Sequence, residues 1–305
     1  MAQHHPIGDK VLLTTQKVWL VTGCSTGFGK SLVPAIIGRG DLVIATARRL
    51  DDLEYTKNYE YVSPLQLDVT ASEEELAASV KEALAIWGRI DVLVNNAGYV
   101  LSGVWEEVTH EQTLQQFETN VFGALKLTCK VLPHMRARGS GVVLFMSSLA
   151  AWRSAGAGGP YSSSKAALEA AVESLYLETR HLGIRTHLLV TGMFRTQILN
   201  SKNRVASTNL GIADYSEIRR NQLERLAASD GKQPGDLAAA VEKILDIARL
   251  ENLNGKGSLD LPLRIPLGSD AVKVLRAKCN ETLELLDVWE EFASSTDFSE
   301  KPNVP

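Results

Sequence analysis

Residues 17–38, KVWLVTGCSTGFGKSLVPAIIG, decide the fold. The apolar run 17–22 predicts a short buried strand, residues 30–38 predict a helix, and three glycines lie in the turn between them. Strand, glycine-rich turn and helix form the first unit of a dinucleotide-binding fold, where the backbone approaches a pyrophosphate at the helix N-terminus. A purely structural turn is the alternative. The position of the glycines between strand and helix favours a bound cofactor.

The rest of the chain repeats the alternation of strand and helix. Further strands are expected at 42–47, 61–67, 90–94, 142–146, 184–190 and 259–263, and helices at 72–87, 111–138, 162–182, 215–228, 234–250 and 269–292. This order indicates an α/β fold with one Rossmann-type, doubly wound parallel sheet of about seven strands and helices on both faces. Ligands of such sheets bind at the carboxyl ends of the strands, where Gly23, Arg48, Asp68 and Asn95 fall.

No repeat or low-complexity linker divides the chain, so we expect one domain. Residues 1–16 are expected to be a flexible N-terminal arm and 17–265 the Rossmann domain. Residues 197–233 are polar and are expected to form a lid over substrate. Residues 266–305 then form a C-terminal helical extension.

Composition excludes several classes of protein. The chain has 305 residues, 45% hydrophobic and 22% charged, which is typical of a globular protein with a large core. A net charge of -4 gives no general attraction for nucleic acid or anionic membranes. No apolar stretch has the length of a membrane span, and the N-terminus lacks the apolar region of a signal peptide. We therefore expect a cytoplasmic protein.

The cysteines and histidines predict neither a disulfide framework nor a metal site. Cys24, Cys129 and Cys279 are odd in number and far apart, which favours free, buried thiols in a reducing compartment. Cys24 lies in the glycine-rich turn, where a small residue is more plausible than a redox group. The six histidines show no metal-ligand spacing.

Residues 147–165 carry the second informative pattern. An apolar run ends at Ser148, and a helix opens at Pro160 with Tyr161 and Lys165 four residues apart. Such a pair shares one helix face, so the ammonium can lower the pKa of the phenol from its free value of about 10. A tyrosine tuned in this way can act as an acid or base near neutral pH. Tyr-x-x-x-Lys alone is common, so the preceding motifs decide its meaning.

The end of the second expected strand indicates the cofactor. A carboxylate at this position would bind the ribose hydroxyls of NAD, whereas arginine suits the 2'-phosphate of NADP. Ala47 is followed by Arg48 and Arg49, which favours NADP(H) over NAD(H). The alternative is that both arginines are solvated loop residues.

Taken in order, these motifs resemble the short-chain dehydrogenase/reductase family over roughly residues 17–265. The resemblance rests on Thr22-Gly23-x-x-x-Gly27-x-Gly29, Asp68, Asn95-Asn96-Ala97-Gly98, Asn120, Ser148, Tyr161-x-x-x-Lys165 and Gly192-x-x-x-Thr196. It implies a catalytic tetrad of Asn120, Ser148, Tyr161 and Lys165. Tyr161 would exchange the proton of a carbonyl oxygen, and Ser148 would donate a hydrogen bond to that oxygen. Asn120 would unwind its helix locally and hold a water that joins Lys165 to solvent.

The resemblance also implies binding residues. The cofactor would contact Gly23, Ser25, Thr26, Gly27, Phe28, Gly29, Arg48, Arg49, Asp68, Val69, Asn95, Ala97, Gly98, Tyr161, Lys165, Gly192, Met193 and Thr196. The substrate would contact Ser148, Ala150, Trp152, Tyr161 and Phe194. Thr191 stands where the family usually has proline, which puts the shape of the following loop in doubt.

The predicted function is an NADP(H)-dependent oxidoreductase that interconverts a ketone or aldehyde and an alcohol on a medium-sized hydrophobic substrate. The alternatives are a non-redox reaction in the same pocket, such as dehydration or cyclisation, and a scaffold protein that binds cofactor without catalysis. The resemblance further implies a homodimer or homotetramer.

Overall fold

The structure is a computed structural model that describes residues 15–196, 204–206, 211–229, 231–253 and 261–298. Nearly all of the expected arm 1–16 and part of the expected lid lie outside these described residues. No helix among them is long and apolar enough to cross a membrane.

A seven-stranded parallel sheet forms the centre of the molecule, which confirms the predicted fold class. Its order is β3-β2-β1-β4-β6-β7-β9. The strands are β1 (Val18–Val21), β2 (Leu42–Ala47), β3 (Val62–Gln66), β4 (Val92–Asn95), β6 (Gly141–Ser148), β7 (Ile184–Thr191) and β9 (Arg264–Leu267). The strand expected at 259–263 is therefore wrong in position, because the last strand pairs with β7 through residues 264–267.

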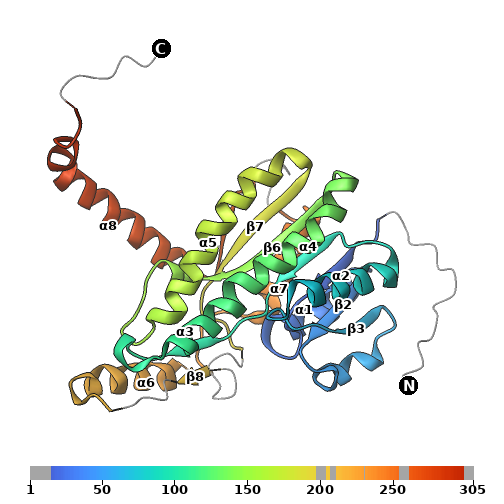
Figure 1. Cartoon of the computed structure of the whole chain (residues 1–305), viewed down its shortest axis with the longest axis horizontal. Coiled ribbons are helices and arrows are strands. Elements are labelled where there is room, and N and C mark those ends of the chain that lie inside the picture. The colour runs from blue at the N-terminus through green and yellow to red at the C-terminus, as the bar shows by residue number, and fades with distance from the viewer. Residues whose placement is uncertain (1–14, 197–203, 207–210, 230, 254–260, 299–305) are drawn as a thin grey trace.

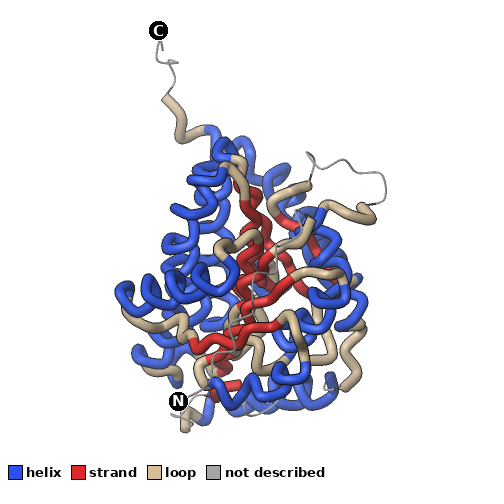
Figure 2. The backbone as a smooth tube through the Cα atoms, turned by 90° about the vertical axis from the view of Figure 1, so that its right-hand side faces the viewer, coloured by secondary structure: helices blue, strands red, loops and turns tan. Residues whose placement is uncertain are grey.

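Helices cover both faces of this sheet, as the two views show (Figures 1 and 2). The main helices are α1 (Gly27–Gly38), α2 (Glu73–Trp87), α3 (His110–Phe117), α4 (Gly123–Arg138), α5 (Gly159–Thr179), α6 (Ser216–Ser229), α7 (Leu237–Arg249) and α8 (Ser269–Ser294). Short turns are η1 (Leu50–Asn58), η2 (Trp105–Glu107), the π-helical η3 (Glu118–Phe122), η4 (Leu149–Ala151), η5 (Arg180–Leu182) and η7 (Ala213–Tyr215). Apolar residues of α2, α4 and α5 form one buried core, and those of α1 and α7 form the other.

The strand order reverses direction between β1 and β4. In a doubly wound sheet the crevice at this switch point, outside the carboxyl ends of the strands, is where ligands bind. The turns that follow β1 and β4 both open there, so the topology places the glycine-rich turn beside the Asn95–Gly98 segment.

Two elements lie outside the main sheet. A small parallel pair, β5 (Val100–Ser102) and β8 (Arg204–Ala206), was not expected from the sequence. In Figure 1 this pair lies close to α6 at one end of the molecule, whereas α8 projects away from the body. The exposed apolar side chains of α8 include Leu283, Leu286 and Trp289.

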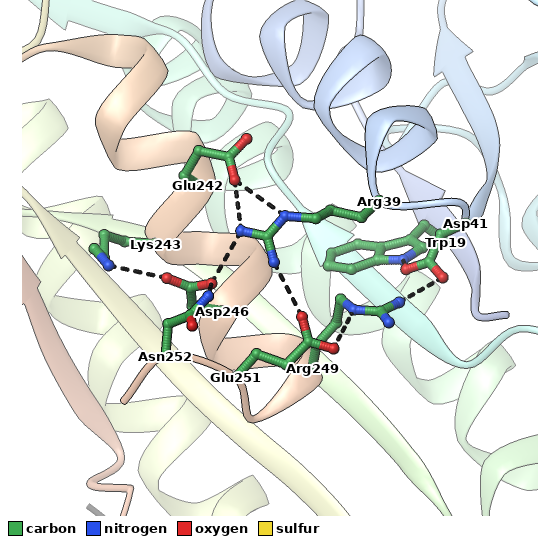
Figure 3. Close-up of polar contacts among 9 residues, drawn as sticks. All are labelled: Trp19, Arg39, Asp41, Glu242, Lys243, Asp246, Arg249, Glu251 and Asn252. Atoms are coloured by element: carbon green, nitrogen blue, oxygen red, sulfur yellow. Dashed lines mark hydrogen bonds and ion pairs between the residues drawn. The ribbon is translucent and has the colours of Figure 1, made fainter. Parts of the chain in front are cut away.

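A polar network joins the end of α1, β1 and the α7 region (Figure 3). Asp41 is 1% exposed, and its carboxylate accepts hydrogen bonds from the Lys17 amide (2.9 Å), the Trp19 indole (2.9 Å) and Arg249 (2.6 Å). Arg39 forms ion pairs with Glu242, Asp246 and Glu251 of the α7 region. Charged partners satisfy the buried carboxylate, so its removal is costly.

We expect Asp41→Asn to lower the free energy of unfolding by about 2–3 kcal/mol, because an amide cannot accept all three hydrogen bonds. Urea unfolding followed by circular dichroism measures the loss. Glu242→Gln is the control: its carboxylate is half exposed, so the same chemical change should cost less than about 1 kcal/mol. Equal losses in the two variants would contradict the role assigned to Asp41.

Candidate active site

The glycine-rich turn is shaped for close approach of a ligand. Gly23 has a φ of +70°, a left-handed conformation that glycine adopts without strain. A Cβ on Gly29 would lie only 2.3 Å from the Gly23 carbonyl oxygen. The α1 N-cap, Thr26, makes no side-chain capping bond, and the first turn of α1 contains no acid. The first amide N–H groups of α1 therefore suit an anion such as a pyrophosphate.

Asn96 holds this turn against β4. Its side-chain amide donates to the Thr22 carbonyl (2.8 Å) and the Gly23 carbonyl (3.2 Å). The Asn95 side chain is buried and donates to Thr128 of α4 instead (2.9 Å). Contact of Asn95 with the cofactor stays a prediction, and the position of Asn96 beside the turn is seen only in the fold.

The arginines after β2 differ in their surroundings. Arg49 is bound by Asp52 through two hydrogen bonds of 3.1 and 2.7 Å. Arg48 is exposed and makes no ion pair within the described chain, while its carbonyl accepts from Gln66 (2.9 Å). A 2'-phosphate near β2 would therefore meet Arg48 first.

A cavity of about 320 Å³ extends from Phe28 to α6. Of the residues predicted from the sequence, it brings together Phe28, Gly98, Ser148, Ala150, Tyr161, Lys165, Gly192, Met193, Phe194 and Thr196. The other predicted residues lie outside its lining: Gly23, Ser25, Thr26, Gly27, Gly29, Arg48, Arg49, Asp68, Val69, Asn95, Ala97, Asn120 and Trp152. The Trp152 indole donates a hydrogen bond to Glu169, and its side chain is not part of the cavity lining.

Tyr161 and Lys165 lie one turn apart on α5, which begins with Pro160 in its first turn. Burial raises the pKa of the Tyr161 phenol, and a hydrogen bond with Ser148 opposes that rise. The pKa of this phenol is therefore raised, whereas the Tyr-x-x-x-Lys spacing suggested a net lowering, because burial is the dominant effect. Lys165 Nζ lies 5.9 Å from the centroid of the phenol ring and donates to the Met146 carbonyl instead (2.7 Å). The phenol is therefore protonated at neutral pH.

Lys165 itself is a buried amine. Burial lowers the pKa of its ammonium group to about 8, and the negative charge of Glu169 opposes this fall. Its protonation state consequently changes close to neutral pH, and Glu169 favours the charged form.

Asn120 lies in the π-helical turn η3, so the helix departs from α geometry at this residue. Its side chain accepts from the Tyr99 amide and donates to the Tyr99 carbonyl and to Ser164, each at 3.1 Å. Asn120 thus ties the helix to the segment after β4 and to α5. A water held by Asn120 stays a prediction.

Glu169 is a site residue that sequence reasoning missed. It is 5% exposed and accepts hydrogen bonds from Ser147 (2.6 Å), from Trp152 (3.2 Å) and from Arg264 (2.9 Å). The available signal was its spacing, four residues after Lys165 on the same helix face. Glu169 thus binds Ser147, the neighbour of Ser148, and places a negative charge that acts on Lys165.

Asp270, in the first turn of α8, was also missed. Its carboxylate accepts from the Met193 amide (2.7 Å). The Thr191 hydroxyl, in the place of the usual proline, donates to the Ser147 carbonyl (2.9 Å), so it ties the end of β7 to β6. The base of α8 therefore fixes the loop after β7, although the sequence suggested that the helix lies outside the shared core.

The thiols differ from expectation in burial. All three cysteines are free, but only Cys24 is buried, because Cys129 and Cys279 are exposed. Burial raises the pKa of Cys24 to about 12, so its thiol is protonated and inert at neutral pH. The described residues hold no group of three or more metal-ligating side chains.

Known oxidoreductases resemble the chain in sequence and in fold. The sequence profile of the short chain dehydrogenase family matches residues 17–206. The uncharacterized oxidoreductase YusZ of Bacillus subtilis is 33% identical over 262 residues, covering 83% of this chain and 89% of that protein. A short-chain dehydrogenase from Streptomyces avermitilis has a TM-score of 0.82 and 36% identity, covering 94% of this chain and 100% of its own.

A short chain dehydrogenase from Burkholderia cenocepacia, solved in complex with NADP, shares the fold with a TM-score of 0.66 and 21% identity. It covers 90% of this chain and 98% of its own. The chain belongs to the short chain dehydrogenase family of oxidoreductases.

Proposed function

We propose that the protein is an NADP(H)-dependent reductase and dehydrogenase that interconverts a carbonyl compound and its alcohol. The observation that carries the proposal is one cavity lined by Tyr161, Ser148 and Lys165, at the switch point of the sheet beside the glycine-rich turn. The apolar lining includes Leu149, Met193 and Phe194 and suits a medium-sized hydrophobic substrate.

The described residues fit a nicotinamide cofactor. The Gly23–Gly29 turn and the open N-terminus of α1 would hold the pyrophosphate, with Arg48 near the adenosine ribose. Asp68 and Val69 would contact the adenine, and Met193 and Thr196 the nicotinamide amide. When bound, the cofactor supplies the hydride in reduction and accepts it in oxidation.

The protein's own groups handle the proton. In the reducing direction the Tyr161 phenol, protonated at neutral pH, donates its proton to the carbonyl oxygen. The Ser148 hydroxyl donates a hydrogen bond to the same oxygen while negative charge develops there. Lys165, when charged, stabilises the phenolate that remains. Oxidation of the alcohol reverses these steps, with the phenolate accepting the proton.

The direct test is oxidation of NADPH in the presence of a panel of hydrophobic ketones and aldehydes, followed by loss of NADPH absorbance. Turnover of at least one carbonyl compound, with the matching alcohol as product, supports the proposal. Binding of NADPH without any turnover across the panel would favour a scaffold, and conversion without loss of NADPH a non-redox reaction.

The choice of cofactor has a separate test. We expect Arg48→Ala to raise the KM for NADPH about tenfold or more while the KM for NADH stays unchanged, because only NADPH carries the 2'-phosphate. Arg49→Ala is the matched control, since Asp52 already binds that guanidinium. Equal effects of Arg48→Ala on the two cofactors would contradict the phosphate contact.

A further inference from the structure

One face of α6 closes the cavity, and that face is polar. Gln222, Arg225, Leu226 and Ser229 line the cavity, and their spacing of i, i+3, i+4 and i+7 defines a single helix face. A lid over a wholly apolar substrate would present apolar side chains here. Three of these four side chains instead carry hydrogen-bonding groups.

The charged side chains among the described residues that line the cavity are all cationic. They are Arg153, Lys165 and Arg225. Lys165 is engaged with the Met146 carbonyl. Neither arginine forms an ion pair with any residue that the structure describes, and Arg225 donates only to the neutral Gln222 amide (2.6 Å). The two guanidinium groups are therefore available to an anion.

Contacts with Glu107 and Gly156 hold α6 against the other side of the cavity. Glu107 is 1% exposed, and its carboxylate binds Arg219 of α6 and accepts from the amides of Gly211 (3.3 Å) and Ile212 (3.2 Å). Ile218 packs close to Gly156, three residues after Arg153, since a Cβ on that glycine would lie 3.1 Å from the Ile218 methyl group. Arg153 and Arg225 thus lie on two sides of one cavity, where both side chains are exposed to solvent.

Gln233 adds an unused polar group to the lining. Its side chain is 2% exposed, and neither its amide nitrogen nor its oxygen has a hydrogen-bond partner within the described chain. A buried carboxamide without partners is costly, which indicates that a polar part of a ligand satisfies it.

We propose that the substrate is an apolar carbonyl compound that carries a carboxylate, and that Arg153 and Arg225 bind this carboxylate. The inference rests on the proposed function, which places the reacting carbonyl at Tyr161. It adds a cationic subsite at the lid side of the cavity, so that an oxo acid is selected over a neutral ketone of the same shape. Charge-assisted hydrogen bonds from guanidinium groups give such selection.

The test uses 3-benzoylpropanoate and its methyl ester, an oxo acid and a neutral compound with the same aryl ketone. With NADPH, the wild-type protein should reduce the acid with a kcat/KM about tenfold or more above that of the ester. Arg153→Ala and Arg225→Ala should each raise the KM for the acid about 10- to 100-fold and leave the ester unchanged. Arg220→Ala is the control, because this arginine is exposed on α6 and pairs with Glu224.

Equilibrium binding of the acid to the protein saturated with NADP+ separates the two proposals. Binding that depends on both arginines, without turnover, would support the subsite and refute the reductase. Turnover of acid and ester with equal kcat/KM in wild type and variants would refute the subsite and leave the reductase intact. Absence of arginine-dependent binding of the acid also overturns the subsite.

Discussion

Replacing Tyr161 by phenylalanine is expected to lower kcat for carbonyl reduction by about 10²- to 10⁴-fold, the usual contribution of a positioned general acid. The change removes one hydroxyl group and leaves the ring in place. The dissociation constant of NADPH should stay unchanged, because the loss affects proton donation to the substrate. Stopped-flow single-turnover kinetics with saturating NADPH measure the chemical step, and fluorescence titration measures cofactor binding.

Tyr176→Phe supplies the control for this prediction. It makes the same chemical change on the same helix, at a residue that lies outside the cavity lining and stacks with Arg180. Its kcat should match that of the wild-type protein. If Tyr161→Phe kept more than about a tenth of the wild-type kcat, another group would have to supply the proton.

Burial of Tyr161 favours its role as the proton donor in carbonyl reduction. It raises the pKa of the phenol, so the proton is present throughout the neutral range and reduction is not limited by loss of the acid. Oxidation of an alcohol needs the phenolate, which becomes more populated as pH rises toward that raised pKa. The ratio of reductive to oxidative activity should therefore fall with increasing pH.

The sequence predicts the architecture because strand–helix alternation is a local pattern. The central buried strands are short apolar runs, and some helices begin with a recognisable signal, such as the capping box of Ser72 and Glu75 in α2. The last strand was misplaced because β9 is short and half buried, so no continuous apolar run marks it. The β5–β8 pair has only three residues in each strand. The two strands lie about 100 positions apart in the sequence and meet only in the folded protein.

The sequence predicts residues that the fold brings to one cavity, and it is less complete about what surrounds them. Ser148 ends β6 at the carboxyl edge of the sheet, and the first turns of α5 bring Tyr161 and Lys165 to the same cavity. Glu169 binds Trp152 and Arg264, which lie 17 and 95 positions away in the sequence. Asp270 binds the amide of Met193, which lies 77 positions away. Such long-range contacts exist only once the helices are packed. The spacing of Glu169 from Lys165 on α5 places the two residues on one face but does not reveal these partners.

The largest expected effect among these missed residues belongs to Glu169. Glu169→Gln keeps the size of the side chain and removes the negative charge that favours the ammonium form of Lys165. The pKa of Lys165, now about 8, should fall further, because burial then acts without an opposing charge. At pH 7.5 to 8 a larger fraction of Lys165 becomes neutral and no longer stabilises the phenolate of Tyr161.

The measurement is the pH dependence of kcat/KM for reduction, which reports groups of the free enzyme. In the wild-type protein activity should be present below about pH 8 and decline above it as Lys165 loses its proton. In Glu169→Gln this decline should begin about one pH unit lower, so that activity at pH 8 falls about fivefold. Glu169→Asp, which keeps the charge, should restore much of the wild-type profile.

Glu173→Gln is the control that separates the effect of the Glu169 charge on Lys165 from a general loss of stability. Glu173 lies one turn further along α5 and binds the same Arg264 (2.7 Å), but it is half exposed and has no contact with Ser147 or Trp152. Removing its charge should leave the pH profile in place, because solvent screens an exposed carboxylate. A profile displaced equally by both variants would show that Glu169 acts through Arg264 and the general charge of the helix. Displacement by Glu169→Gln alone would establish that this buried carboxylate sets the pH range over which Lys165 supports Tyr161.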